Sequence, residues 1–257
     1  MTDGRTGEAT SGGRVARNRQ RRSRQFLTAA QRIVTHDGFE SLTMTRLSDE
    51  LDAAVSSVYR YFPSKGHLVR AIQAEAIARL AHSLELSVDD VVDAVVQRLV
   101  QGRGEVATGL VRLVVLGRWF CAAAEVLPED VRLLQMISSQ RSSTLDPEGG
   151  EALLAPSLAL LGQVAMALEQ AEAEGAIRPA PALNRTVLWA SALGGALAAD
   201  DFERYIPDIA GGGRLAHQLN IDLLVGWGAA ADAVARVDAA VDQVATERPL
   251  ARTEDDG

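Results

Sequence analysis

The sequence predicts an all-α protein in which a small N-terminal domain is joined to a larger helical domain. Apolar residues recur at three- and four-residue spacing through most of the chain, and alanine is abundant, as in amphipathic and buried helices. No stretch alternates apolar and polar residues convincingly, as a strand would. Glycine, proline and short polar segments interrupt the helical pattern and divide the chain into about nine or ten helices.

Length and composition are typical of a globular protein. The 257 residues, 47% of them hydrophobic, fit one large domain or a small and a larger one. The longest apolar stretches, such as residues 113–116, are far shorter than the roughly 20 residues that span a bilayer, and the basic N-terminus lacks the apolar stretch of a secretory signal. The lone Cys121 excludes an intramolecular disulfide and fits a reducing compartment. We therefore expect a soluble, cytoplasmic protein without a membrane partner.

Charge is distributed unevenly along the chain. The net charge is −8, yet residues 1–70 carry 12 Lys and Arg against 7 Asp and Glu, while the remainder carries 14 against 27. The densest basic cluster lies between Arg14 and Arg24, and residues 9–36 contain no acid. A basic N-terminal module attached to an otherwise acidic protein indicates that the module binds a polyanion.

Both ends of the chain are expected to be flexible. Residues 1–20 are rich in Gly, Ser, Thr and Arg and have almost no large apolar side chains, which predicts a flexible Arg-rich arm. Residues 241–257 are predicted to form a flexible acidic tail. The arm is a candidate for additional phosphate or minor-groove contacts, and a merely solvated arm is the alternative.

Three predicted helices make up the N-terminal module, residues 21–68. The first covers residues 23–37, with Phe26 and Ile33 on one face and Gly38 as its C-terminal cap. A very short helix follows the N-cap residue Thr43. The third opens near Ser56, after a turn at residues 52–54. It buries Val55, Val58 and Phe62 and ends at Pro63.

Two short helices joined by a tight turn, with a helix before them, predict a helix-turn-helix whose second helix lies in the major groove of DNA. Ser64 then caps a fourth helix. Hydroxyl and guanidinium groups suit phosphate oxygens and base edges. The outer or flanking positions of the third helix belong to Ser56, Ser57, Tyr59, Arg60 and Tyr61. The alternative is that Tyr59, Tyr61 and Phe62 form only a small aromatic core.

The run from Leu42 to Leu68 resembles the N-terminal domain of regulators of the tetracycline-repressor (TetR) family. The resemblance covers about a fifth of the chain and rests on Gly38-Phe39 and on a Tyr-x-x-Phe-x-x-Lys frame, Tyr59 to Lys65. It implies a three-helix DNA-binding domain joined to a larger helical ligand-binding and dimerisation domain. It also implies phosphate contacts from Thr43, Ser57, Tyr59 and Lys65, and contacts to bases or adjacent phosphates from Ser56, Arg60 and Tyr61.

Lys65 is the only lysine of the chain, and it stands just inside a helix N-terminus, whose field attracts phosphate. Two residues depart from the family pattern. Ala54 stands in the turn where such domains often have Gly, so the backbone there must accommodate a Cβ. His67 stands where Glu would complete a capping box with Ser64, so a reciprocal bond is lost.

The resemblance implies that residues 69–240 form the ligand-binding and dimerisation domain. The helix over residues 103–127 is the most apolar of the chain. Met and aromatic side chains are typical of adaptable pockets, although at helical spacing they also build an ordinary core. The candidate ligand contacts are Arg118, Trp119, Met136, Met166 and Trp189.

Two later helices are candidates for a dimer interface. The first contains Leu188, and its small residues Ala192, Gly195 and Ala196 allow close approach of another helix. The second spans Leu215 to Gly228. Two such helices from each subunit would form a four-helix bundle. The alternative is that both pack within one chain.

Enzymatic chemistry finds no support in the sequence. Gly102-Arg103-Gly104 and the residues after it match a loose dinucleotide fingerprint but have no βαβ context. No histidine pair has metal-ligand spacing, and Cys121 lies in an apolar helix without an evident partner. We expect no catalytic site, metal or cofactor.

These observations and the resemblance predict a homodimeric transcriptional regulator. It is expected to act as a repressor, bound to a palindromic operator of double-stranded DNA and released by a small hydrophobic molecule, with the fourth helix as the lever between the domains. The alternative is a helical interaction protein, or an enzyme that retains the N-terminal domain as a scaffold.

Overall fold

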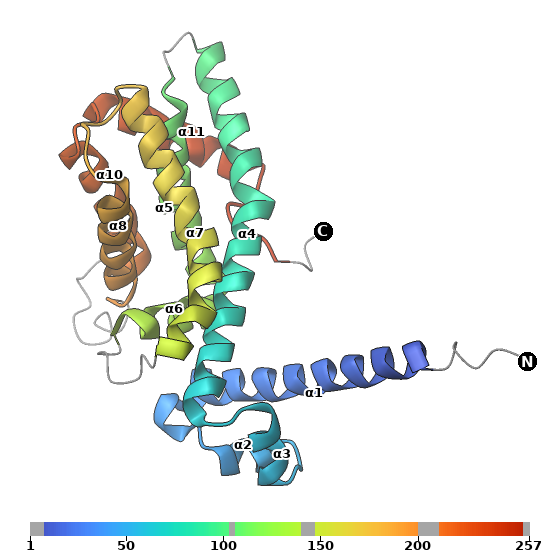
Figure 1. Cartoon of the computed structure of the whole chain (residues 1–257). Helices are drawn as coiled ribbons and strands as arrows, with labels where there is room; N and C mark the ends of the chain where they lie inside the picture. Colours follow the sequence, from blue (N-terminus) through green and yellow to red (C-terminus); the bar gives the residue numbers. More distant parts are fainter. Residues whose placement is uncertain (1–7, 103–105, 140–146, 200–210, 254–257) are drawn as a thin grey trace, which may run out of the picture. The chain divides into compact units, whose positions relative to one another are not determined.

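The computed structural model describes residues 8–102, 106–139, 147–199 and 211–253, and within these ranges it contains helices and no strands (Figure 1). The all-helical prediction is therefore confirmed. The helices are α1 (Glu8–Asp37), η1 (Phe39–Ser41), α2 (Met44–Glu50), α3 (Val55–Tyr61), α4 (Lys65–Gln101), α5 (Thr108–Val126), α6 (Pro128–Ser139), α7 (Pro147–Ala173), α8 (Ala182–Leu197), α10 (Gly212–Gly226) and α11 (Ala231–Ala245). The chain divides within α4 into two compact units, one up to Ala74 and one from Glu75 onward, with the short segment 146–152 grouped with the first.

The first unit is built around Phe26 of α1, which is fully buried. Its ring meets that of Phe62 edge to face, with centroids 6.5 Å apart, and that of Tyr61 at 5.4 Å. Leu47 of α2 and Val58 of α3 are also fully buried. At the predicted cap of α2, Oγ1 of Thr43 accepts a hydrogen bond from the backbone N–H of Arg46 at 3.0 Å.

The turn between α2 and α3 accommodates Ala54 without strain. Ala54 has φ −67° and ψ 138°, an extended conformation that any residue adopts, and the positive φ of this turn falls on Asp52, at 45°. The backbone N–H of Ala53 closes the turn on the carbonyl of Ser48 at 2.9 Å. The prediction of Ser56 as a cap was wrong, because α3 begins at Val55 and no side chain caps it.

Both ends of the described chain are more ordered than predicted. The first helix begins at Glu8 instead of Ser23, so residues 8–20 continue α1; Arg, Gln and Ala are good helix formers, and no proline interrupts them. At the other end, Ala251 is 5% exposed, and the backbone N–H of Arg252 donates to Oγ of Ser83 at 3.3 Å. Burial of Ala251 and this hydrogen bond therefore fix the predicted flexible tail as far as residue 253.

The second unit is organised around α5, most of whose residues are buried. This helix contacts α6, α8, α10 and α11. Its first turn has no side-chain cap of its own. Instead, Oε2 of Glu174, from the turn after α7, accepts a hydrogen bond from the backbone N–H of Gly109 at 2.8 Å, which satisfies a donor that the helix start leaves free.

Gly117 permits the close packing of α10 against α5. A Cβ at Gly117 would lie 2.3 Å from Nδ2 of Asn220, a fully buried residue of α10. Asn220 is held from the other side by Trp189 of α8, whose Nε1 donates to Oδ1 at 2.7 Å. Gly117, Asn220 and Trp189 thus fix the mutual positions of α5, α10 and α8.

Ion pairs hold α11 and α10 to the outer edge of α5. Nη1 of Arg118 lies 3.3 Å from Oδ1 of Asp238, and Nε2 of His217 lies 2.9 Å from the same oxygen. Arg118 also pairs with Asp242. Burial by itself raises the pKa of Asp238, but the hydrogen bond from His217 and the charges of His217 and Arg118 outweigh it, so the pKa lies below its usual value.

We expect Gly117→Ala to lower the free energy of unfolding by about 2 to 3 kcal/mol, because the added methyl group overpacks a buried polar contact. Gly162→Ala, in α7, is the matched control, since nothing lies within 4 Å of a Cβ at that position; the better helix propensity of alanine makes it neutral or stabilising by up to about 1 kcal/mol. Urea denaturation measures both. Equal effects of the two substitutions would contradict this account of the packing.

Asp238→Asn is expected to cost about 1 to 2 kcal/mol at pH 7, because it removes a charged acceptor from a site that retains some solvent contact. Since the folded pKa of Asp238 is lowered, its carboxylate stabilises the fold above the unfolded pKa of about 3.9. This contribution is lost as the pH falls through the folded pKa. Unfolding measured from pH 7 to pH 3 should show the two proteins converging, and a constant difference would refute the assignment.

Candidate nucleic-acid interface and internal pocket

The predicted DNA contacts of α3 share its outer surface. Ser56 and Arg60 are exposed, and Tyr59 is 49% exposed. Ser57 and Tyr61 are half-buried. Val58 and Phe62, on the other side of the helix, are in the core. The hydroxyl and guanidinium groups therefore lie together on one face, within reach of a ligand outside the domain.

The aromatic residues of α3 divide between core and surface. Tyr61 packs against Phe26, and Phe62 is buried, as the core interpretation proposed, whereas Tyr59 projects outward. The guanidinium of Arg60 lies 5.6 Å from the centre of the Tyr61 ring, and its Nη2 donates to Oγ of Ser57 at 3.3 Å. Tyr61 thus supports the orientation of Arg60 as well as the core.

Lys65 has an intramolecular role that the sequence did not indicate. Its Nζ donates to the carbonyl oxygen of Phe39 at 3.2 Å and lies 4.4 Å from the centre of the Phe39 ring. The lysine thereby ties the start of α4 to η1. Thr43, the remaining candidate of the interface, is exposed while its hydroxyl caps α2.

His67 contacts the cap residue of α4 through its side chain. Oγ of Ser64 accepts a hydrogen bond from the backbone N–H of His67 at 3.3 Å, and Nδ1 of His67 lies 2.9 Å from the same hydroxyl. The departure from the capping box therefore retains a side-chain contact between these two positions.

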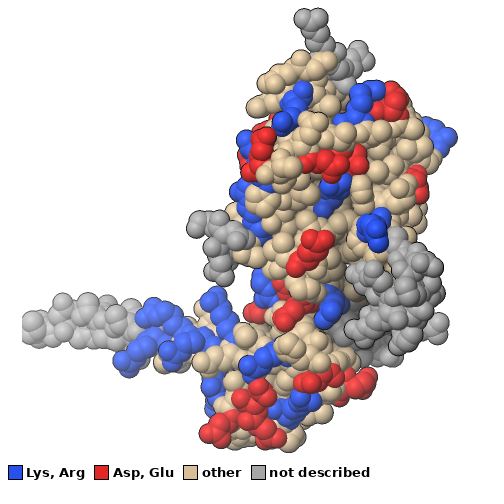
Figure 2. All heavy atoms as spheres, turned by 180° about the vertical axis from the view of Figure 1, so that it is seen from behind, with Lys and Arg blue, Asp and Glu red and all other residues tan. Residues whose placement is uncertain are grey.

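Basic side chains on α1 add to the charge of the first unit. Figure 2 shows Lys and Arg gathered on α1. The exposed members are Arg14, Arg17, Arg19, Arg21 and Arg24. Two other arginines of the unit are neutralised, because Arg32 pairs with Glu50 and Arg46 pairs with Asp37.

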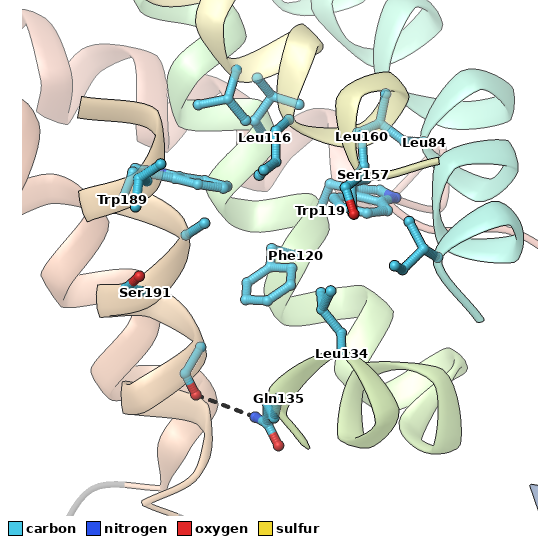
Figure 3. A pocket seen from close by; sticks show the side chains of 16 residues that line it. Leu84, Leu116, Trp119, Phe120, Leu134, Gln135, Ser157, Leu160, Trp189 and Ser191 are labelled. Atoms are coloured by element: carbon cyan, nitrogen blue, oxygen red, sulfur yellow. Dashed lines mark hydrogen bonds between the residues drawn. The ribbon is translucent and has the colours of Figure 1, made fainter. Parts of the chain in front are cut away.

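An internal pocket of about 220 Å³ lies in the second unit (Figure 3). Side chains from α4 to α8 line it, and none of them is charged. The lining is formed by Ile77, Leu84, Leu116, Trp119, Phe120, Leu134, Gln135, Ser157, Leu160, Leu161, Val164, Val187, Trp189, Ala190, Ser191 and Gly194. Such an apolar cavity with a few polar groups is the usual form of a small-molecule site.

Gln135 and Trp119, in the wall of the pocket, carry polar side-chain groups. Nε2 of Gln135 donates to the carbonyl oxygen of Gly194 at 3.2 Å, which links α6 to α8 at the pocket wall (Figure 3). Trp119 is 2% exposed, and its Nε1 has no hydrogen-bond partner within the described structure. A buried donor without a partner is costly, and this cost belongs to the packing of Trp119 into the wall of the pocket.

The candidate ligand residues separate into two groups. Trp119 and Trp189 line the pocket, whereas Arg118 takes part in the ion pairs with Asp238 and Asp242, and Met166 is 54% exposed and outside the lining. The side chain of Met136 lies outside the described residues. Phe120, an aromatic residue of the most apolar helix, also lines the pocket. Gln135 was not anticipated, because no sequence signal marked it.

The outer faces of α8 and α10 carry exposed apolar side chains. Leu183 and Leu188 of α8 are 67% and 51% exposed, and Val225 of α10 is 37% exposed. The two helices pack on each other within the chain. Gly195 lies on the exposed side of α8, with nothing within 4 Å of a Cβ built there. An apolar face of this kind is suited to contact with a second protein surface.

Residues 26–72 match the family model described as bacterial regulatory proteins, tetR family. Over 62 residues, 24% of this chain, the sequence is 39% identical to the HTH-type transcriptional repressor KstR of Mycobacterium tuberculosis, and the match spans 28% of that protein. It is 32% identical over 68 residues to the nicotine-responsive repressor HdnoR of Paenarthrobacter nicotinovorans, spanning 26% of this chain and 35% of that protein. The chain thus matches about a third or less of these curated relatives.

Solved structures share the fold over most of the chain. A tetR-family regulator from Shewanella sp. PV-4 aligns with a TM-score of 0.52 at 16% identity, covering 80% of this chain and 95% of its own. AibR, solved with isovaleryl coenzyme A and operator DNA, aligns with a TM-score of 0.50 at 18% identity, covering 79% and 98%. In the described part of the chain, no helix combines the length and hydrophobicity of a membrane span. The N-terminal domain therefore matches the tetR family of bacterial regulatory proteins over residues 26–72, and the helical fold of most of the chain is similar to that of solved tetR-family regulators.

Proposed function

We propose that this protein is a homodimeric, ligand-responsive transcriptional repressor that acts on the chromosome in the cytoplasm. Residues 21–68 would bind a roughly palindromic operator, and residues 69–240 would bind the ligand and form the dimer. The observation that carries the proposal is the outer face of α3, where Ser56, Tyr59 and Arg60 are exposed while Val58 and Phe62 anchor the helix.

A seven-residue helix with this surface suits the major groove. Its first residues include Ser56 and Ser57, which are small enough for close approach to base edges, and Arg60 and Tyr59 supply longer donors at the rim. Thr43, Tyr61 and Lys65 lie in the same unit and complete the proposed set of phosphate or base contacts. Phosphate contacts would orient the domain, and contacts to base edges would select the sequence.

A homodimer explains both the expected operator symmetry and the exposed apolar face of α8 and α10. Leu183, Leu188 and Val225 would be buried between two copies, in a bundle of two helices from each. Two helix-turn-helix domains would then reach successive major grooves about 34 Å apart. A closed two-fold arrangement would use the same face of both copies, so the contact would not extend into a polymer.

The ligand is proposed to be small, uncharged and largely apolar. The pocket offers apolar and aromatic walls and the polar side chains Gln135, Ser157 and Ser191, but no cation. Isovaleryl coenzyme A, present in the structure of AibR, carries phosphates that this lining does not neutralise. Desolvating an anion here would be unfavourable, so a neutral molecule fits this site better.

Helix α4 provides the connection through which a ligand would alter DNA binding. It starts at Lys65 in the helix-turn-helix unit, and farther along the chain its residues Ile77 and Leu84 line the pocket. A ligand that binds better when these side chains are displaced would shift the population towards dimers with incorrectly spaced DNA-binding domains. Affinity for the operator would then fall.

We expect the protein to bind DNA from upstream of its own gene in preference to competitor DNA, with log K falling by about 0.9 per neutralised phosphate and per tenfold rise in salt. Ser56→Asp should weaken binding about 100-fold or more, because it places a carboxylate against DNA. The substitution should leave the fold intact, since an acid near the start of α3 is favourable for a helix. Fluorescence anisotropy measures the affinities.

Gln97→Glu is the control for the DNA measurement, because it adds the same charge at an exposed position of the second unit. It should leave operator affinity nearly unchanged. Equal affinities of the wild type and Ser56→Asp would show that α3 is not the reader. A genome-wide selection of bound fragments extends the test. If the wild type binds no fragment more tightly than competitor DNA, the alternative is favoured: a helical interaction protein, or an enzyme that retains the domain as a scaffold.

A matched pair of fluorescent probes tests the pocket. N-phenyl-1-naphthylamine is uncharged, and 8-anilinonaphthalene-1-sulfonate has the same ring system with an added anionic group. The uncharged probe should bind at least about tenfold more tightly, because the lining has no cation to offset desolvation of the sulfonate. Preferential binding of the anionic probe would contradict the proposed ligand class.

Ser157→Phe locates the probe, since it inserts a ring into the pocket and should abolish probe binding while operator binding persists. Leu158→Phe is its control: the neighbouring side chain is 57% exposed and does not line the pocket. Probe titrations and denaturation of both variants distinguish loss of the pocket from loss of the fold. An unchanged probe affinity in Ser157→Phe would place the probe elsewhere.

A further inference from the structure

A second basic feature of the first unit lies between α1 and α3. Asn18 and Arg19 of α1 and Arg60 and Tyr61 at the end of α3 line an open notch of about 380 Å³. Two of these residues belong to the segment that the sequence predicted to be a flexible arm. Because the segment continues α1, these side chains are held beside the predicted recognition helix.

The packing of Phe26 determines which side chains reach the notch. Arg19 precedes Phe26 by seven residues, or about two helical turns, so both lie on nearly the same face of α1. Phe26 is buried against Tyr61 and Phe62 at the end of α3. Arg22 lies between them in sequence, with its guanidinium 5.0 Å from the centre of the Phe26 ring. The aromatic contacts therefore place Arg19 near Arg60.

The notch concentrates positive charge that nearby acids do not neutralise. Arg19 and Arg60 form no ion pair within the described residues, in contrast to Arg32 and Arg46, which pair with Glu50 and Asp37. Arg60 is positioned by Ser57 and by the ring of Tyr61. Two guanidinium groups, an amide and a phenol that surround an open space form the donor set that recognises a phosphate.

We propose that the notch binds a phosphodiester group of the DNA backbone, and that the N-terminal part of α1 is a second, sequence-independent DNA contact. This inference rests on the proposed operator binding. Residues 8–22 of α1 form a helix roughly 22 Å long, which corresponds to about six base pairs of B-DNA. Their exposed arginines include Arg14, Arg17 and Arg21. The notch lies at the end of α3, and from there these arginines would extend the phosphate contacts beyond the bases read by α3 onto flanking DNA.

The test uses full-length protein and two operator duplexes, one trimmed to the recognised half-sites and one extended by about six base pairs on each side. On the extended duplex, Arg19→Gln should lower affinity about five- to tenfold and reduce the steepness of the salt dependence by about 0.9 per bound phosphate. On the trimmed duplex, the variant and the wild type should differ little. The preference for operator over random DNA of equal length should not change, because a phosphate contact carries no sequence information.

Two control variants remove the same charge elsewhere. Arg132→Gln changes an exposed residue of α6 in the second unit and should have no effect. Arg24→Gln changes an exposed arginine on another face of α1 and should cost less than Arg19→Gln. If the Arg19 and Arg24 variants lose equal affinity, α1 acts as a diffuse charge and the notch assignment is overturned. Circular dichroism confirms that each variant retains its helices.

A double-mutant cycle tests whether Arg19 and Arg60 share one phosphate. The combined loss of affinity in the variant carrying both Arg19→Gln and Arg60→Gln should be smaller than the product of the two single fold-changes, and independent effects would overturn a shared site.

Titration with inorganic phosphate is a second experiment. If free phosphate binds in a way that depends on Arg19, and Arg19→Gln leaves DNA affinity unchanged, the notch is assigned to a free anion. If the wild type binds no operator, the proposed function itself fails; if it binds and Arg19→Gln behaves as wild type on both duplexes, only the notch proposal fails.

Discussion

Burial of α5 is the constraint on which the second unit depends. The helix contacts α6, α8, α10 and α11, and an apolar segment of this length has no stable place except within a shell of other helices. Glycine at position 117 lets α10 approach, and Asn220 joins α10 to Trp189 of α8 through a buried hydrogen bond. The same helix presents Trp119 and Phe120 to the pocket, so the packing that stabilises the unit also shapes the candidate ligand site.

In the first unit, an aromatic cluster both stabilises the fold and positions the candidate DNA-binding surface. Phe26 orients α1 against the end of α3, while Val58 and Leu47 hold α2 and α3 together. Polar groups then fix the ends of short helices that would be unstable alone: Thr43 caps α2, and Lys65 joins the start of α4 to the carbonyl of Phe39. Thr43 and Lys65, which the sequence resemblance assigns to DNA contacts, therefore also stabilise the fold. Substitutions at either position would affect both stability and DNA binding.

The two candidate sites differ sharply in their electrostatics. The surface of α1 and α3 carries arginines without ion-pair partners among the described residues, whereas the pocket lining has no charged side chain. The arginine beside the pocket helix, Arg118, is neutralised by Asp238 and Asp242. One unit is thus suited to a polyanion and the other to a neutral molecule, and α4 contributes residues to both units. This separation allows ligand and DNA to influence each other without sharing a surface.

The sequence by itself determined the helical class, the caps at Thr43 and Ser64 and the buried face of α3, because these depend on spacing and local hydrogen bonding. Only the tertiary structure decided the rest. It placed Arg118 in an ion-pair network and Met166 on the surface, selected Gln135 for the pocket, and packed Ala251 in the core. It also extended α1 to Glu8, which placed Arg19 beside Arg60. These outcomes depend on which helix faces pack against each other across distant parts of the chain. Helical periodicity identifies the apolar face of a helix but does not specify the segment against which that face packs.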